Sequence, residues 1–376
     1  MKKPYEINNE IRLWSTFVPE ETGEEVAKTL KSTWINTGKK EAELRTNFSK
    51  KFGAKFVVAT NSGTSSLRAA LATIGVGPGD EVISTPYTFI ATNTSILEQG
   101  AKPVFADIKY ETLNIDPASI VKKITKKTKA ITCVHYGGNA CEMDAIRKIG
   151  KEYNLPIIED SAHAIGSKYH GKYIGEEGDL ITFSLQAIKI ITCGDGGLVA
   201  TPKKKYYDLL RKYIWFGVDR ENKKTTFIDP LPEKIDILGY KFNMNDITAT
   251  MALVGLKHVD EALEKRRRLG EWYRRELANL SKVKLVELDP KNTPNFQIFP
   301  IHIKNRMAFA HFMRDNGIFV NVNNRRNDRY SIFGKMQNLP GLKKADEDTI
   351  LIPIHHHLSD KDMEKIISTI KKYDKA

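Results

Sequence analysis

The stretch "FVVATNSGTSSLRAALATIGVGPGDEVISTPYTFIATNTSILEQGAKPVFADI", residues 56–108, alternates between two hydrophobic patterns. Short apolar runs that end in polar turns are typical of buried strands, and the segments between them have helical periodicity. The expected strands are 56–63, 80–86 and 102–108, and the expected helices are 65–76 and 88–100. This alternation predicts βαβ units, and therefore a mostly parallel, doubly wound α/β sheet flanked by helices.

The alternation continues toward the C-terminus. Further strands are expected at 129–136, 155–162 and 196–201, with helices at 144–154 and 204–213. A long helical pattern at 245–280 is expected to break near 257–262. After it, a smaller α/β unit is expected, with strands at 297–303 and 318–323 and helices at 307–317 and 360–373. Because 376 residues exceed one simple core, we expect a large domain over 1–250 and a small domain over 251–376.

The composition is that of a globular protein without a membrane span. Apolar residues make up 41% of the chain and charged residues 28%, and no run long enough to span a bilayer is apolar throughout. The net charge of +13 comes from basic residues spread over helix-like segments, which favours solvated faces over a nucleic-acid surface. Three cysteines are too few for a disulfide framework, and the N-terminus lacks the apolar segment of a signal peptide. We therefore expect a cytoplasmic protein.

The polar turn in "TNSGTSSLRAAL", residues 60–71, lies between an expected strand and an expected helix. Unpaired N–H groups at a helix N-terminus and the helix dipole favour an anion, which makes Gly63, Thr64 and Ser65 candidates for phosphate binding. The same residues are compatible with plain helix capping, in which Ser62 or Thr64 is the N-cap.

A second motif is "IIEDSAHAIG", residues 157–166, in which an apolar strand delivers Glu159 and Asp160 to its C-terminal end. A carboxylate at that depth needs a cationic partner or several hydrogen-bond donors. His163 follows three residues after Asp160. Taken alone, the motif is better explained by a capping aspartate with an incidental histidine.

Two further motifs carry a lysine and an aromatic ring. In "FSLQAIKIITCGDGG", residues 183–197, Ser184 and Lys189 precede a glycine-rich turn. Lys189 is either an ordinary exposed lysine or a buried amine kept for chemistry. In "TPYTFIAT", residues 85–92, Phe89 is either a ring that stacks on a ligand or part of the core. A single ligand satisfies all four motifs, pyridoxal 5'-phosphate, which requires a Schiff-base lysine, an acid at its ring nitrogen and a phosphate site.

The four motifs together resemble the DegT/DnrJ/EryC1/StrS family of sugar aminotransferases, which have the fold type I architecture and depend on pyridoxal phosphate. The resemblance begins near "STWINTGKKEAELRTNFSKKF", residues 32–52, and continues through "GYKFNMNDITATMALVGLKHVDE", residues 239–261. It ends with "LPGLKKADEDTILIPIHHHLSDKDMEKI", residues 339–366, and so covers nearly the whole chain. It implies a mostly parallel seven-stranded-type sheet with a smaller C-terminal α/β domain.

The resemblance also assigns roles to the cofactor residues. Lys189 stands where the family has its Schiff-base lysine, Asp160 where it has the partner of the pyridinium nitrogen, and His163 where a side chain contacts the ring's 3'-oxygen. The phosphate turn corresponds to Gly63, Thr64 and Ser65, and the hydroxyl beside it to Ser184. The aromatic ring that stacks on the cofactor corresponds to Phe89. Asn243 matches a residue that reaches the phosphate from the neighbouring subunit, which implies a homodimer with shared active sites.

Substrate contacts are expected in "WFGVDRENK" and "NVNNRRNDRYSIFG", residues 215–223 and 321–334, where the family builds its sugar-nucleotide pocket. The candidates are Arg220, Asn323, Arg325 and Arg326, and the arginines are equally explained as solvated surface residues. The segment "NNRRND" departs from the commoner family pattern, in which a histidine-containing segment follows "GI", residues 317–318 here. Three consecutive histidines, His355 to His357, point to alternate sides of an extended segment, so no metal site is expected.

The expected activity is transfer of an amino group from an amino acid, glutamate in the family, to a 3-keto or 4-keto sugar linked to a nucleotide. The product would be an amino sugar of the kind used in lipopolysaccharide or other surface polysaccharides. Two alternatives share the fold: a sugar dehydratase, in which histidine replaces the lysine, and a non-catalytic regulatory homologue. Lys189, Asp160 and the phosphate turn argue against both. A third alternative, a nucleic-acid-binding protein, is suggested by the net charge and by nothing else in the sequence.

Overall fold

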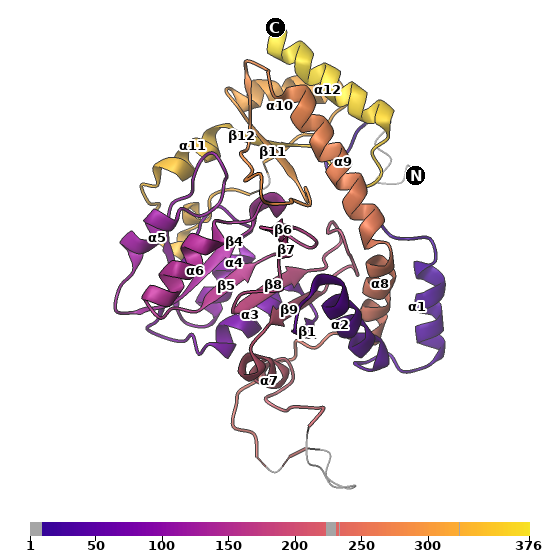
Figure 1. Cartoon of the computed structure of the whole chain (residues 1–376), viewed down its shortest axis with the longest axis vertical. Coiled ribbons are helices and arrows are strands. Elements are labelled where there is room, and N and C mark those ends of the chain that lie inside the picture. The colour runs from indigo at the N-terminus through magenta and orange to yellow at the C-terminus, as the bar shows by residue number, and fades with distance from the viewer. Residues whose placement is uncertain (1–9, 223–230, 233, 323) are drawn as a thin grey trace.

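The structure, a computed structural model, describes residues 10–222, 231–232, 234–322 and 324–376 (Figure 1). Its large sheet has seven strands in the order β1-β9-β8-β5-β4-β2-β3. These strands are β1 (Phe56–Thr60), β2 (Glu81–Ser84), β3 (Lys102–Phe105), β4 (Thr128–Val134), β5 (Ile157–Asp160), β8 (Leu180–Ser184) and β9 (Gly197–Thr201). The five strands β3, β2, β4, β5 and β8 run parallel, and β9 is antiparallel to its two neighbours, β8 and the edge strand β1. The predicted mostly parallel α/β sheet is confirmed.

Helices cover both faces of this sheet. One face carries α3 (Gly63–Thr73), α4 (Ala91–Glu98) and α7 (Lys204–Tyr213), and the other carries α2 (Lys39–Phe52), α6 (Met143–Glu152) and α8 (Asp246–Lys257). The consecutive residues Ile157 and Ile158 of β5 belong to the two different hydrophobic clusters. Both faces are therefore buried, which explains why the strands are continuous apolar runs. Asp160 shares its face with Ile158 and α3, and Glu159 points to the opposite face.

A second, smaller sheet lies beyond two consecutive helices. Helix α8 ends at Lys257 and α9 (Val259–Leu277) begins after His258, so the predicted break in the long helical pattern is confirmed. Figure 1 shows the two helices running from the large sheet toward the small one, beside α1 (Thr22–Lys31). The small antiparallel sheet is β10 (Val283–Leu285), β11 (Phe299–Ile303) and β12 (Thr349–Ile352), and it packs with α9, α10 (Arg306–Asp315) and α12 (Asp360–Lys375) around its own core. The predicted boundary at residue 250 lies within α8 and stays a prediction.

The expected strand at 318–323 was wrong for its described residues. Ile318 and Asn321 form isolated bridges, to Ile11 and Leu351 respectively, because this segment pairs with single residues of two different segments rather than with one strand. Sequence patterns also missed α5 (Pro117–Lys123), α11 (Pro340–Asp348) and the hairpin of β6 (Lys168–Tyr169) and β7 (Lys172–Tyr173). These elements are short, and short elements give weak periodic signals.

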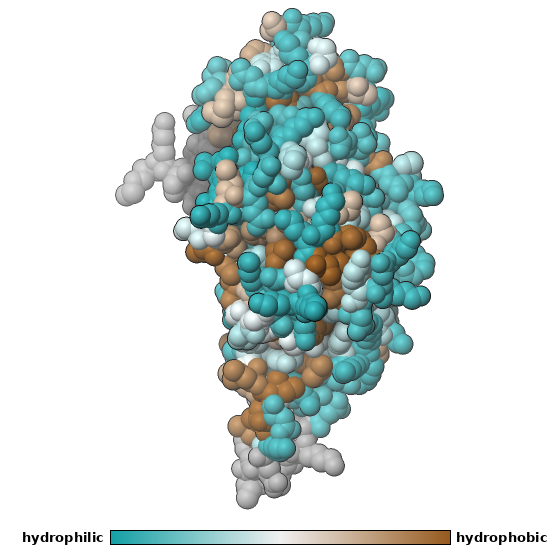
Figure 2. Space-filling model, turned by 90° about the vertical axis from the view of Figure 1, so that its left-hand side faces the viewer, coloured by the Kyte–Doolittle hydropathy of each residue, from teal (hydrophilic) through white to brown (hydrophobic). Residues whose placement is uncertain are grey.

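The surface of the described chain is largely polar on the side where α5, α6 and α11 lie. Figure 2 shows this face as mainly hydrophilic, with apolar residues gathered in a few areas near its middle and lower end. Among the helices that the structure describes, none is both long enough and apolar enough to cross a bilayer.

Candidate active site

A cavity of about 460 Å³, which we call the strand-end cavity, opens where the parallel strands end and α3 begins. Open α/β sheets bind ligands at this edge, because the carboxyl ends of parallel strands and the N-termini of the following helices meet there. Seven of the residues predicted from sequence line it: Gly63, Thr64, Phe89, Asp160, His163, Ser184 and Lys189. The structure therefore brings together four motifs that lie far apart in the chain.

The turn before α3 is a capped helix start that leaves backbone N–H groups facing the cavity. Ser62 is the N-cap, and its hydroxyl oxygen accepts from the Ser65 N–H at 3.1 Å. The first turn of α3 thus leaves the N–H groups of Gly63 and Thr64, both of which line the cavity, without a hydrogen-bond acceptor among the described residues and open to a ligand. Ser65 itself is not a lining residue, because its hydroxyl donates to Asn61 Oδ1 at 2.6 Å inside the turn.

Two glycines allow this turn to pack against the end of β8. A Cβ atom at Gly63 would lie 2.9 Å from Ser184 Cβ, and one at Gly197 would lie 2.5 Å from the Ser62 carbonyl oxygen. Both distances are shorter than van der Waals contact, so any side chain at either position would push the turn away from the sheet. Gly197 therefore shapes the turn before α3 by allowing its close approach to β9.

Substitution Gly63→Ala should raise the dissociation constant for pyridoxal phosphate at least about 10-fold, because the displaced turn misplaces two N–H donors. Titration of the apoprotein with the cofactor, followed by absorbance, measures this constant. Gly77→Ala is the matched control, since a Cβ atom there meets no atom within 4 Å. Equal affinities for the two variants would show that the turn does not hold the phosphate.

Asp160 is a buried carboxylate whose hydrogen-bond donors among the described residues are both neutral. Thr92 Oγ1 donates to Oδ2 at 2.7 Å, and the Ala162 N–H donates to Oδ1 at 3.1 Å. Burial raises the pKa of Asp160, and the hydrogen bond from Thr92 and that from Ala162 oppose the rise. A cation placed against this carboxylate would reverse the penalty, as a protonated ring nitrogen does.

His163 is held in one tautomer. The Gly137 N–H donates to His163 Nδ1 at 3.4 Å, so this nitrogen carries no proton and the proton lies on Nε2. Burial, and then the positive charge of Lys189, hold the pKa of His163 well below its ordinary value. The neutral ring therefore presents an N–H donor from Nε2, as binding a ring oxygen requires.

The Lys189 amine lies in the same cavity, on a loop fixed from two sides. The Lys189 N–H donates to the Gln186 carbonyl at 2.9 Å, and Gln297 Nε2 donates to the Ile188 carbonyl at 2.8 Å. Burial lowers the pKa of Lys189 to about 8, Asp160 partly opposes this change and the buried Arg266 adds to it. Lys189 is therefore neither an ordinary exposed lysine nor a permanently charged one.

The low pKa predicts how the apoprotein captures the cofactor as pH changes. At pH 7 a pKa of about 8 leaves about one amine in ten unprotonated, which is about 300 times the fraction for an ordinary lysine. The rate of covalent capture of pyridoxal phosphate should rise up to pH about 8 and then level off, because the free amine is the nucleophile. Stopped-flow absorbance between pH 6 and about 10 measures this rate. A rate that keeps rising to about pH 10 would show an ordinary lysine.

Phe89 is 64% exposed and lines the cavity, so of its two interpretations the core residue is excluded. Sequence patterns missed several other lining residues. Trp14, Tyr136 and Asn324 also line the cavity, from segments far apart in the chain. Asn324 lies in the segment 321–334 where substrate contacts were expected, although it was not itself named, whereas no periodic or motif signal marked Trp14 or Tyr136, whose place depends on how distant segments approach one another.

The predicted substrate arginines do not line this cavity. Arg326 is 4% exposed and forms a bidentate ion pair with Asp328, with distances of 2.6 and 2.7 Å, and it also donates to the Gln337 carbonyl. This pairing occupies its guanidinium, so the structure does not favour Arg326 as a diphosphate ligand. Arg325 is exposed outside the cavity, Asn324 lines it, and Asn323 lies outside the described residues.

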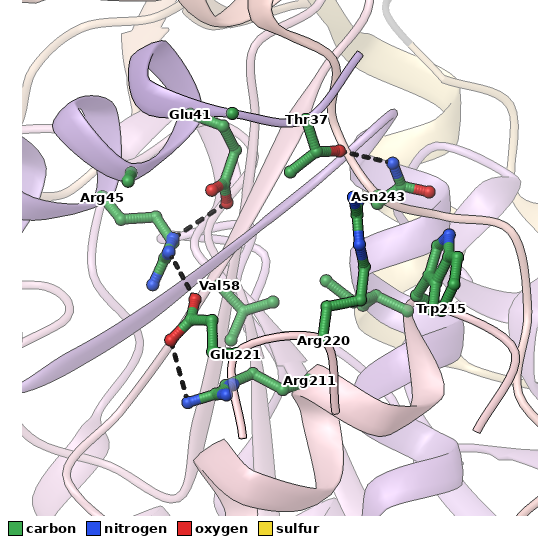
Figure 3. Close-up of a pocket in the computed structure, with 12 residues that line it drawn as sticks. Thr37, Glu41, Arg45, Val58, Arg211, Trp215, Arg220, Glu221 and Asn243 are labelled. Atoms are coloured by element: carbon green, nitrogen blue, oxygen red, sulfur yellow. Dashed lines mark hydrogen bonds and ion pairs between the residues drawn. The ribbon is translucent and has the colours of Figure 1, made fainter. Parts of the chain in front are cut away.

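Asn243 and Arg220 lie in a second cavity of about 430 Å³ between α2 and α7, which we call the α2–α7 cavity (Figure 3). Asn243 Nδ2 donates to Thr37 Oγ1 at 2.6 Å, and Lys241 Nζ donates to Asn243 Oδ1 at 3.0 Å. The Arg220 guanidinium lies over the Trp215 ring, and its buried Nη1 has no hydrogen-bond partner among the described residues. Neither Asn243 nor Arg220 lines the strand-end cavity.

The three consecutive histidines bind the N-terminal segment of the described chain. His355 Nε2 donates to the Arg12 carbonyl and His357 Nε2 to the Thr16 carbonyl, each at 3.0 Å, and His356 stacks on Phe17. In the part of the chain that the structure describes, no group of three histidine, cysteine, aspartate or glutamate side chains is placed to hold a metal.

The strand-end cavity fits pyridoxal phosphate on the chemistry of its donors. The α3 N-terminus suits the phosphate, and the buried Asp160 carboxylate, which receives only neutral hydrogen bonds, suits a protonated ring nitrogen. His163 Nε2 supplies a donor, Phe89 an aromatic face and Lys189 an amine of lowered pKa. Each group that the cofactor requires therefore has a residue in this one cavity.

Comparisons with known proteins identify the family. A model described as the DegT/DnrJ/EryC1/StrS aminotransferase family matches residues 18–371. The uncharacterized protein MJ1066 of Methanocaldococcus jannaschii is 35% identical over 94% of this chain and 95% of its own. The sugar aminotransferase CalS13 of Micromonospora echinospora superposes with a TM-score of 0.91 at 31% identity, over 96% of this chain and 99% of that one.

A third relative was solved with the cofactor. The PLP form of the putative sugar aminotransferase Spr1654 of Streptococcus pneumoniae superposes with a TM-score of 0.89 at 27% identity, over 97% of this chain and 99% of that one. The expected fold type I architecture is thereby confirmed. We conclude that the chain belongs to the DegT/DnrJ/EryC1/StrS aminotransferase family and is a pyridoxal-phosphate-dependent aminotransferase.

Proposed function

We propose that this enzyme transfers an amino group from L-glutamate to a 3-keto or 4-keto sugar linked to a nucleotide, and so makes a nucleotide-linked amino sugar. The observation that carries the proposal is the meeting of Lys189, Asp160 and the α3 N-terminus in one cavity of a chain from this family. The sugar aminotransferases among its structural relatives support a sugar as the amino acceptor.

The residues of the strand-end cavity divide the work. Pyridoxal phosphate, when bound, supplies an aldehyde that bonds to an amine and a ring that accepts an electron pair. Asp160 keeps the ring nitrogen protonated, and the N–H groups of Gly63 and Thr64 hold the phosphate. Lys189 Nζ, whose pKa is about 8, would take a proton from the donor's Cα and deliver it to the former aldehyde carbon of the cofactor, on the other side of the transferred nitrogen.

One cavity serves two substrates in turn. Glutamate leaves its amino group and departs as 2-oxoglutarate before the keto sugar enters, which gives ping-pong kinetics. The same Lys189 amine then moves protons in the reverse direction on the sugar carbon. The two substrates differ in shape, yet the Lys189 amine serves both, as the base when neutral and as the acid when protonated. Only the direction of proton transfer changes.

We further propose a homodimer in which the α2–α7 cavity of one subunit faces the strand-end cavity of the other. Asn243 and Arg220 lie together there, and the orphaned Arg220 Nη1 needs an acceptor such as a phosphate. Large apolar side chains are exposed in nearby segments, with Trp34 at 63% and Leu238 at 90%. Such side chains are typical of a subunit interface.

The three described cysteines are free thiols, which supports a cytoplasmic location.

Mixed dimers test the shared site. Neither Lys189→Ala nor Asn243→Ala should be active alone, but a heterodimer of the two holds one site with both substitutions and one with neither. Differently tagged, co-expressed subunits should therefore recover about half of the wild-type activity per purified heterodimer. Lys189→Ala mixed with Asp160→Asn is the matched control and should recover nothing, because both residues serve the same subunit's site. Failure of the first mixture would place Asn243 outside the partner's site.

A substrate panel tests the reaction itself. The purified enzyme is incubated with glutamate and nucleotide-linked 3-keto or 4-keto sugars, and NMR of the product locates the new amino group. Formation of an amino sugar with one equivalent of 2-oxoglutarate supports the proposal. Loss of water from the sugar without any use of glutamate would instead show a dehydratase. A downstream use in surface polysaccharides follows only if such an amino sugar is formed.

A further inference from the structure

A short N-terminal segment, residues 11–17, is anchored at both ends against the body of the protein, and we call it the strap. At its start the Ile11 N–H donates to the Gly317 carbonyl and the Phe319 N–H donates to the Ile11 carbonyl, each at 2.9 Å. At its end the Phe17 ring stacks on His356, with 3.7 Å between ring centroids. The strap is therefore held at two places rather than lying loosely on the surface.

His355 and His357 hold the strap between these anchors. Their Nε2 atoms donate to the carbonyls of Arg12 and Thr16, each at 3.0 Å. His355 is 5% exposed, and burial lowers its pKa to about 4, so the ring is neutral at physiological pH. The carbonyls one residue inside each end of the strap thus accept hydrogen bonds from two side chains that alternate along 355–357.

Trp14 lies between the two gripped carbonyls and lines the strand-end cavity together with Phe89, Asn324 and Lys189. Its inner side packs against a hydrophobic cluster that includes Leu13. A large ring fixed on one side and facing a cavity on the other needs little further ordering when a ligand binds. The indole is therefore a preorganised wall of the cavity.

We propose that Trp14 is the wall that receives the sugar ring of the acceptor substrate, and that His355 and His357 are positioning residues that hold it there. The inference rests on the proposed function. The sugar carbon that gains the amino group must come within reach of Lys189, so the part of the substrate inside the cavity is the sugar rather than the nucleotide. The C–H groups of a sugar ring pack on the apolar face of an indole, which supplies contact area without a hydrogen bond.

Kinetics of the two half-reactions test the role of Trp14. Trp14→Ala should raise KM for the keto sugar about 10-fold, with kcat changed less than about 3-fold and the glutamate half-reaction unchanged. Trp14→Phe should recover most of the loss, because a ring remains. Trp272→Phe is the control, since Trp272 packs against the core of the small sheet. An unchanged KM, or an equal loss in the glutamate half-reaction, would overturn the proposal.

A binding measurement separates this inference from the proposed reaction. Calorimetry compares the nucleotide diphosphate with an unreactive nucleotide sugar carrying the same base, for wild type and Trp14→Ala. The proposal expects the nucleotide sugar to lose about 10-fold in affinity and the diphosphate to lose nothing. Equal losses would place the indole at the nucleotide instead. If the wild type binds the sugar through Trp14 but transfers no amino group to any keto sugar, the proposed function fails and this inference stands.

The histidines are tested by paired substitutions at one position. His355→Leu removes the donor to the Arg12 carbonyl, whereas His355→Gln keeps an N–H near the same place. We expect His355→Leu to raise KM for the sugar about 3-fold or more with kcat unchanged, and His355→Gln to stay near wild type. Equal behaviour of the two variants would show that His355 does not position the strap.

Discussion

Replacing Lys189 by alanine is expected to lower the rate of transamination at least about 10⁴-fold, because positioned acid–base groups alone contribute 10²–10⁴-fold. The change removes the amine that bonds to the cofactor and the base that moves the donor's Cα proton. Among the described residues that line the cavity, Lys189 is the only lysine, so no neighbouring amine replaces it. Initial rates of 2-oxoglutarate release from glutamate measure the loss.

Two comparisons make this result specific. Lys343→Ala removes an exposed lysine of α11 and should leave the rate unchanged. Adding methylamine to the Lys189→Ala enzyme should restore part of the rate, because a small amine can enter the space left by the side chain and move the proton. A rate above about one-hundredth of wild type without added amine would remove Lys189 from the catalytic step.

Asp160→Asn is expected to lower kcat about 10³-fold while the cofactor still binds, because the ring nitrogen loses the charge that keeps it protonated. Thr92→Val removes a hydrogen bond that favours the ionised carboxylate, so it should lower kcat about 5-fold to 10-fold. The two variants thus weaken the negative charge of the same carboxylate to different degrees, because Asp160→Asn removes it and Thr92→Val only makes it less favourable. Single-turnover absorbance with glutamate measures the first half-reaction directly.

The stability of the apoprotein provides the control for Asp160→Asn. Burial raises the pKa of Asp160 above its unfolded value, so the ionised carboxylate costs stability once pH exceeds that unfolded value. The uncharged asparagine avoids this cost, and the thermal midpoint of the apoprotein at pH 7 should not fall. Asp208→Asn, which breaks an exposed ion pair with Lys204, should leave kcat unchanged. Loss of activity together with early unfolding would point to misfolding instead of a missing charge.

Sequence reasoning located the catalytic groups because each lies in a local motif. Lys189, Asp160 and Gly63 follow or precede strands that are continuous apolar runs, and strand ends of this kind converge at one edge of the sheet. Their convergence in one cavity could therefore be predicted before any contact was seen. The break at His258 was also predictable from local sequence, because the helical pattern itself is interrupted there.

The residues that sequence reasoning missed depend on contacts between distant segments. Thr92 lies in the first turn of α4 and donates to Asp160 at the end of β5, and Trp14 lines the cavity from the strap, which His355 and His357 hold. Arg326 is a different case, because the contact that occupies its guanidinium is with Asp328, only two residues away. A short-range ion pair of this kind leaves no periodic trace in the sequence.

The antiparallel strand β9 also decides when the cofactor site can exist during synthesis. Strand β1 is an edge strand whose one neighbour in the sheet is β9, and the turn after β1 rests against Gly197 at the start of β9. A nascent chain still lacking residues 197–201 has made the phosphate turn's sequence but not the surface that shapes it. We therefore expect capture of pyridoxal phosphate to follow the pairing of β9 with β1 rather than to guide the early folding of the chain.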